Sequence, residues 1–173
     1  MKKIILSLVC FLFFSAAHAQ LYVFGVGARA GKFNTGISIK SFFNADNATG
    51  LLLDGYYTNI ASKGYTIKAI LIKQIPFKMP IVQLPLDFIY GGGIHGAYFP
   101  YNKQGYYKRR NGEPVYYEKS VMSAGVDATI QIEYQVKKIA PFTIGIDVVP
   151  YYEFYNPGPE WIDFGVTVRY VFR

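Results

Sequence analysis

His95 is the residue in this chain best suited to acid–base chemistry, and apart from His18 it is the only histidine. An imidazole acts as a general base when a hydroxyl lies within hydrogen-bond reach. On an extended strand its same-face neighbours would be Gly93 and Ala97, neither of which is a nucleophile. Ser123 is a hydroxyl that another strand could bring to it. We therefore interpret His95 as a packed interior residue and predict that the chain is not an enzyme.

Metal and cofactor chemistry has little support in the sequence. The single cysteine, Cys10, lies in an N-terminal apolar run, so the rest of the chain has no thiol, disulfide or cysteine metal site. The glycine run 91–93 lacks the Lys and Ser/Thr of a phosphate-binding loop. No metal-ligand spacing occurs, and we predict neither metal nor cofactor.

A basic and aromatic segment occupies residues 100–119, where tyrosines alternate with cations. Its basic residues are Lys103, Lys108, Arg109, Arg110 and Lys119. Such a loop could bind phosphate or carboxylate groups, including those of lipopolysaccharide, through charge-assisted contacts. It could instead be a solvated, mobile loop that its charge keeps soluble. Both interpretations stay open.

Residues 1–19 have the composition of a cleavable signal peptide. Lys2 and Lys3 precede an apolar run over residues 4–17, and Ala17 and Ala19 supply small residues before a cleavage site. The run is shorter than the roughly 20 residues that a membrane-spanning helix needs. We predict one mature domain over residues 20–173. The formal net charge of +7 could suit nucleic acid in a cytosolic protein, but an exported chain does not meet that partner.

Alternation with a period of two dominates the mature chain and predicts β-strands. In the last strand Phe164, Val166 and Val168 share one face, whereas Asp163 and Arg169 lie on the other. Eight segments follow this rule: residues 24–31, 37–43, 51–58, 65–73, 87–99, 123–134, 142–154 and 162–172. With turn residues between them, they predict an all-β, closed, antiparallel up-and-down transmembrane β-barrel.

The termini of such a barrel lie on one side, in the periplasm, because an even number of strands returns the chain to its starting side. The expected outward loops are residues 32–36, 59–64, 100–119 and 156–160. The expected inward turns are residues 44–48, 74–86 and 135–141. The 74–86 connection is long for a periplasmic turn.

The polar face of these strands is predicted to line a narrow lumen. Gly125, Gly145 and Gly165 lie on that face, where a filled interior gives a reason for residues without side chains. The predicted lumen charge network consists of Arg29, Lys40, Asp54, Lys68, Asp127, Asp147, Asp163 and Arg169. Three further acidic residues lie on the same strand faces but could instead lie at strand ends in contact with water: Asp87, Glu133 and Glu153. Enclosed charges require partners, so we expect internal ion pairs and no open pore.

Aromatic residues make up 18% of the chain and gather near strand ends, as in the girdles of membrane barrels. One expected girdle contains Phe43, Phe88, Tyr134, Phe142, Tyr170 and Phe172. The other contains Tyr57, Tyr65, Tyr98, Phe154 and Trp161.

The chain resembles the small OmpX- and OmpA-like outer-membrane β-barrel proteins of Gram-negative bacteria over nearly all of residues 22–173. The resemblance rests on four segments: the glycine-rich first strand 24–31, the segment 90–95, the stretch 147–150 and the closing strand 164–172. It implies a location in the outer membrane, contact with its lipids, and recognition of the last strand by the barrel-insertion machinery. In that family the strand ends on an aromatic residue, whereas here Phe172 is followed by Arg173.

The expected function is that of an integral outer-membrane barrel with a structural or surface-interaction role, for which the sequence indicates no particular surface partner. One alternative is a soluble periplasmic or secreted lipocalin-like ligand-binding barrel, since such barrels also alternate. The chain lacks the Gly-x-Trp that lipocalins carry near the mature N-terminus. A further alternative is an outer-membrane lipid-modifying enzyme that uses His95.

Overall fold

The structure is a computed structural model. It describes residues 23–44, 48–58, 63–78, 84–100, 106–108, 114–116, 119–136, 141–154 and 162–172. The predicted signal peptide lies outside the described residues. Within these ranges, the chain contains no helix of the length and apolar character needed to cross a membrane.

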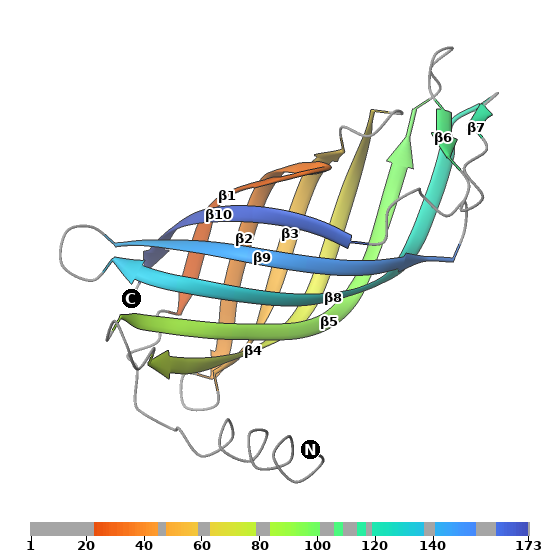
Figure 1. The fold of residues 1–173 in the computed structure, drawn as a ribbon. Coiled ribbons are helices and arrows are strands. Elements are labelled where there is room, and N and C mark those ends of the chain that lie inside the picture. Colours follow the sequence, from red (N-terminus) through yellow and green to blue (C-terminus); the bar gives the residue numbers. More distant parts are fainter. Residues whose placement is uncertain are drawn as a thin grey trace, which may run out of the picture.

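Eight antiparallel strands close into a single barrel (Figure 1). They are β1 (Phe24–Gly31), β2 (Asn34–Asn44), β3 (Thr49–Thr58), β4 (Gly64–Lys78), β5 (Pro85–Phe99), β8 (Val121–Val136), β9 (Phe142–Glu153) and β10 (Ile162–Phe172). Each strand pairs with the next barrel strand along the chain, and β1 pairs with β10 to complete the cylinder. The predicted closed, all-β, up-and-down architecture is therefore confirmed.

The barrel has two distinct ends (Figure 1). At the terminal end, Phe24 at the start of β1 lies opposite Phe172 at the close of β10. At the other end, β6 (Tyr106–Lys108) and β7 (Pro114–Tyr116) form a separate two-stranded hairpin within the 100–119 connection, and we call this the hairpin end. The sequence analysis did not predict this hairpin.

The prediction of a loop over residues 32–36 is wrong for residues 34–36. Residues 34–36 belong to β2, where Gly36 lies opposite Tyr56, and the turn is formed by Lys32 and Phe33. A Cβ atom on Gly36 would collide with the carbonyl oxygen of Gly55. This glycine therefore serves the close approach of two strands and not a turn.

The expected 74–86 connection is also wrong, because the strands on both sides extend into it. Strand β4 continues to Lys78 and β5 begins at Pro85, which leaves residues 79–84 as the connection. Pro76 lies inside β4 opposite Asp87, but the pairing of β4 with β3 has already ended at Lys73. Since that side of β4 is an edge at Pro76, the missing N–H of proline costs no ladder hydrogen bond.

The barrel is polar inside and apolar outside along most of its length. Exposure alternates residue by residue, as between Ile146 at 60% and its neighbour Asp147 at 6%. The interior is not uniformly polar, because an apolar cluster fills it toward the terminal end. This cluster consists of Phe42, Leu52, Ile70, Ile72, Ile89 and Val171. Charged and uncharged polar side chains occupy most of the remaining interior.

Candidate functional site

The inward faces of the strands bring the predicted lumen residues together. Arg29, Lys40, Asp54, Lys68, Asp127, Asp147, Asp163 and Arg169 are all buried. Their positions share the inward parity of their strands, and barrel closure places residues more than a hundred positions apart in contact, as with Arg29 and Asp147. Three clusters of ion pairs result.

The first cluster is centred on Arg29, toward the hairpin end. Its Nε donates to Oδ1 of Asp147 at 2.9 Å, and its Nη1 donates to Oδ2 of Asp163 at 2.7 Å. The hydroxyl of Thr167 donates to Asp147 at 3.0 Å, and the amide of Asn34 donates to Asp163 at 3.2 Å. The guanidinium thus meets two carboxylates that are themselves hydrogen-bonded, as enclosed charges require.

The second cluster joins Lys40, Glu133 and Arg169. The two oxygens of Glu133 accept separately from Lys40 Nζ at 2.7 Å and Arg169 Nη1 at 2.9 Å. Arg169 also donates through Nε and Nη2 to the hydroxyl of Ser38. Glu133 has no exposed surface, so the interpretation that places it at a wet strand end is wrong. Asp87 is buried as well, whereas Glu153 is partly exposed at the hairpin end.

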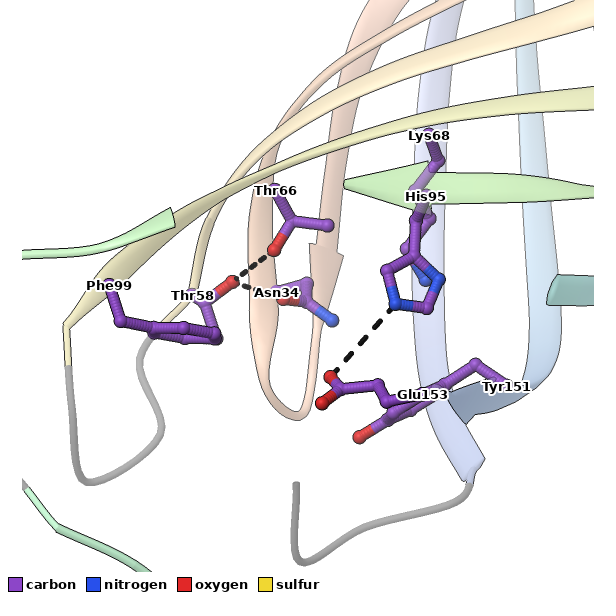
Figure 2. Close-up of a pocket in the computed structure, with 8 residues that line it drawn as sticks. All are labelled: Asn34, Thr58, Thr66, Lys68, His95, Phe99, Tyr151 and Glu153. Atoms are coloured by element: carbon purple, nitrogen blue, oxygen red, sulfur yellow. Dashed lines mark hydrogen bonds and ion pairs between the residues drawn. The ribbon is translucent and has the colours of Figure 1, made fainter. Parts of the chain in front are cut away.

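The third cluster contains His95. Asp127 accepts from Lys68 Nζ at 2.8 Å through one oxygen, and its other oxygen lies 2.7 Å from His95 Nδ1. The remaining ring nitrogen, Nε2, points toward Glu153 and lies 4.0 Å from its Oε1 (Figure 2). Ser123, the hydroxyl that the sequence offered to His95, donates instead to Glu153 at 3.0 Å. Among the described residues, the imidazole therefore contacts carboxylates, and Ser123 contacts Glu153.

A small cavity lies beside His95 at the hairpin end, between the imidazole and Glu153 (Figure 2). It is lined by Asn34, Thr58, Thr66, Lys68, His95, Phe99, Tyr151 and Glu153. Its volume of about 30 Å³ accommodates one or two water molecules. A water molecule is the natural bridge across the 4.0 Å between His95 and Glu153.

Asp54 lies between the first two clusters without an ion pair of its own. It is hydrogen-bonded to the hydroxyls of Ser38 and Tyr56, and its Oδ1 has no hydrogen-bond partner among the described residues. The ring of Tyr56 also faces Arg29, whose Cζ lies 5.3 Å from the ring centroid. Tyr56 and Ser38 were not predicted as lumen residues. Tyr56 lies two residues after Asp54 on the same inward face of β3, and Ser38 lies two residues before Lys40 on the inward face of β2.

Glycines create the room that the charged side chains occupy, as predicted for the narrow lumen. A Cβ atom on Gly165 would lie 2.6 Å from Cζ of Arg29. One on Gly145 would collide with the amide of Gln131, and one on Gly125 would lie 2.6 Å from Cε1 of His95.

The structure describes only part of the predicted anion-binding loop. Lys103, Arg109 and Arg110 lie outside the described residues. Lys108 belongs to β6, and Lys119 is exposed just before β8.

Ion pairs join the charged groups of each cluster inside the barrel. In the described part of the chain, no group of three or more His, Cys, Asp or Glu side chains is placed to hold a metal ion. Comparison with protein-family models and with curated proteins finds no match for this chain.

Proposed function

We propose that this chain is an integral outer-membrane β-barrel protein with a structural or surface-interaction role and a lumen plugged by ion pairs. In this proposal residues 1–19 direct export, outer-membrane lipids surround the barrel, and the barrel-insertion machinery recognises β10. The protein would then be similar in kind to the small OmpX- and OmpA-like barrels. The observation that carries the proposal is that the barrel has polar and charged side chains inside and apolar side chains outside, the reverse of a water-soluble protein.

The outward face of the described strands is apolar almost everywhere. Ile67, Ile94, Met122, Ile146 and Phe164 are each more than half exposed. Apart from tyrosines, Lys73 is the only ionisable residue of outward parity whose side chain the structure describes in these strands. A continuous apolar surface of this kind is an aggregation liability in water. Hydrocarbon solvates it well, and closure gives each barrel strand a hydrogen-bonded neighbour on both sides over the length where the strands overlap.

Aromatic side chains gather toward both ends of the exterior. At the terminal end Phe142, Tyr170 and Phe172 form a chain of ring contacts, with centroids 5.3 and 4.9 Å apart. At the hairpin end Tyr57 and Tyr65 are in edge contact at 5.8 Å. Trp161 lies outside the described residues, and Phe88 and Tyr134 are only partly exposed. Two aromatic belts separated by aliphatic residues match the two interfaces of a bilayer.

A lipocalin-like protein would share the closed barrel but would need an internal binding cavity. Pockets for small organic ligands have volumes of roughly 300–1,000 Å³ and are mostly apolar. The cavity beside His95 measures about 30 Å³ and is bordered by ionisable groups. Its size and lining favour the membrane barrel over a carrier of apolar ligands.

Fractionation of a Gram-negative host that expresses the full chain tests the proposal. We expect the protein to stay in the membrane pellet after a carbonate wash and to migrate differently in SDS gels before and after boiling. A protein released into the soluble fraction would contradict the proposal and support the lipocalin-like alternative.

The surface-interaction part of the proposal concerns the loop that carries Lys108, Arg109 and Arg110. Changing these three residues together to Gln removes the charge that would contact lipopolysaccharide phosphates. We expect weaker binding of lipopolysaccharide by the purified variant, with Lys63→Gln at the same end of the barrel as control. Unchanged binding by the triple variant would eliminate this loop as an anion site.

A further inference from the structure

The barrel exterior carries an apolar groove of about 430 Å³ that crosses four strands, from the terminal half of β8 to the hairpin end of β1. One wall is a row of outward side chains on neighbouring strands: Ile132, Ile146, Val166 and Ala30. The other wall is the next row toward the hairpin end: Ile130, Val148, Phe164 and Lys32. The backbone of Gly31, Asp147 and Gly165 lies between the rows and forms the floor.

The dimensions of the groove suit a single extended hydrocarbon chain. Four adjacent strands span three inter-strand spacings, or about 14 Å. The two rows stand two residues apart along each strand, about 7 Å. Both walls are aliphatic or aromatic except at one corner, where Lys32 stands.

Lys32 gives the groove a charged end. Its backbone N–H donates to the carbonyl of Phe164 at 2.9 Å, which fixes the residue beside β10. Its ammonium group lies 4.4 Å from the centroid of the Phe33 ring, and the residue is exposed. The other ionisable residue of the lining, Asp147, contributes backbone to the floor while Arg29 holds its carboxylate inside the barrel. The exterior of the groove is therefore cationic at one end and apolar elsewhere.

We propose that this groove seats one acyl chain of lipid A, with Lys32 contacting a phosphate of the same lipid. The proposal rests on the proposed function, because export places the hairpin end at the outer leaflet, where lipopolysaccharide resides. A chain in the groove buries apolar surface on both walls, and the ammonium group adds a charge-assisted contact to the phosphate. The other basic residues of the hairpin end are not required for this contact.

Two pairs of variants separate groove binding from general attraction to lipid. Lys32→Gln removes the charge at the groove, and Lys63→Gln removes an exposed charge at the same end of the barrel on the β4 side. Ala30→Phe fills the groove, and Ala28→Phe adds the same ring two residues earlier on the same outward face. Ala30→Leu provides a smaller filling residue should the phenyl ring prevent assembly.

The measurement is native mass spectrometry of the detergent-solubilised full-length protein, titrated with purified lipid A or with phosphatidylglycerol. We expect one tightly retained lipid A. Its apparent affinity should fall about fivefold in Lys32→Gln, a loss typical of one surface cation at an anionic lipid. It should fall about tenfold or more in Ala30→Phe, because the apolar contact area is lost. Both control variants should match the unmodified protein.

Several outcomes would overturn the lipid seat. Phosphatidylglycerol retained as tightly as lipid A would leave only unspecific attraction between charges. An equal loss of affinity for lipid A in Ala28→Phe and Ala30→Phe would show that the groove is not where lipid A binds. A membrane-embedded, heat-modifiable protein that retains no lipid A refutes the seat alone, whereas a soluble protein refutes the proposed function and the seat together.

Discussion

Arg29 and Asp163 link the first and last strands of the barrel through an ion pair of 2.7 Å between Nη1 and Oδ2. Both side chains are at most 2% exposed, and they lie at the seam where β1 pairs with β10. Asp163 also accepts from the backbone N–H of Phe33 at 3.2 Å, so the same carboxylate holds the first turn against the last strand. A charge contact between residues 134 positions apart therefore adds to the backbone pairing that closes the cylinder.

Asp163→Asn should weaken the contact between β1 and β10, but it leaves Arg29 with one charged partner, Asp147. Asp147 still binds the guanidinium, so we expect the free energy of unfolding to fall by about 1–3 kcal/mol. Asp147→Asn should cost more, about 3–5 kcal/mol, because Asp147 accepts from two guanidinium nitrogens and from Thr167. Urea unfolding in detergent micelles, followed by circular dichroism, measures both. A larger loss of stability in Asp163→Asn than in Asp147→Asn would contradict the expectation that Asp147 contributes more than Asp163.

Glu133 should be the least replaceable member of the second cluster. Glu133→Gln leaves Lys40 and Arg169 without their shared carboxylate, and we expect a loss of about 3–5 kcal/mol or failure to assemble. Lys40→Met leaves the Glu133–Arg169 pair intact and puts an apolar chain beside Phe42, so its cost should be smaller. The same urea titration measures the free energy of unfolding of both variants. Equal losses of stability in the two variants would mean that Lys40 is as hard to replace as Glu133.

Glycine replacement should distinguish the inside of the barrel from its outside. Gly165→Ala places a methyl group 2.6 Å from the Arg29 guanidinium, which two carboxylates hold in position. We expect a loss of about 1–3 kcal/mol from overpacking. A Cβ on outward-facing Gly96 meets nothing within 4 Å, so Gly96→Ala should be neutral or slightly stabilising. Similar midpoints of urea unfolding for the two variants would argue against a tightly filled lumen.

An outward arginine should report on the solvent around the barrel. Val168 lies in the middle of β10 and is 45% exposed. In hydrocarbon, Val168→Arg should cost about 2–4 kcal/mol, the penalty measured for arginine near the bilayer midplane. In water an exposed substitution usually changes stability by no more than about 0.5 kcal/mol. Unfolding from lipid vesicles provides the measurement, and an unaffected Val168→Arg variant would speak against hydrocarbon at this face.

His95 should have no catalytic role toward lipids. Its Nδ1 is committed to Asp127, and Ser123 donates to Glu153. We therefore expect overexpression of the protein to leave the mass spectrum of lipid A from the host unchanged, and His95→Ala to leave it unchanged as well. A modification of lipid A that depends on the protein and disappears in His95→Ala would establish the lipid-modifying alternative.

Strand positions and facing directions could be predicted from the sequence because alternation is a local property. The predicted limits of β1 and β10 agree with the structure, and residues such as Asp147 and Arg169 face inward as their parity indicates. Turn limits were less well predicted. The sequence predicts that residues 32–36 and 74–86 connect strands, yet Gly36 belongs to β2 and Pro76 belongs to β4. Both errors arise because glycine and proline are also tolerated where strands approach closely or where one side of a strand is unpaired.

The sequence by itself therefore determined which residues enter the lumen, but not which of them meet. Partner choice depends on the register between strands and on barrel closure, since these set the height of each side chain along the axis. Arg29 reaches Asp147 and Asp163, whereas Lys68 reaches Asp127, although all of them share one parity. Only the tertiary structure placed Glu133 between two cations, bonded Ser123 to Glu153, and aligned two rows of side chains into an exterior groove. Such contacts join residues far apart in the chain, and no local pattern encodes them.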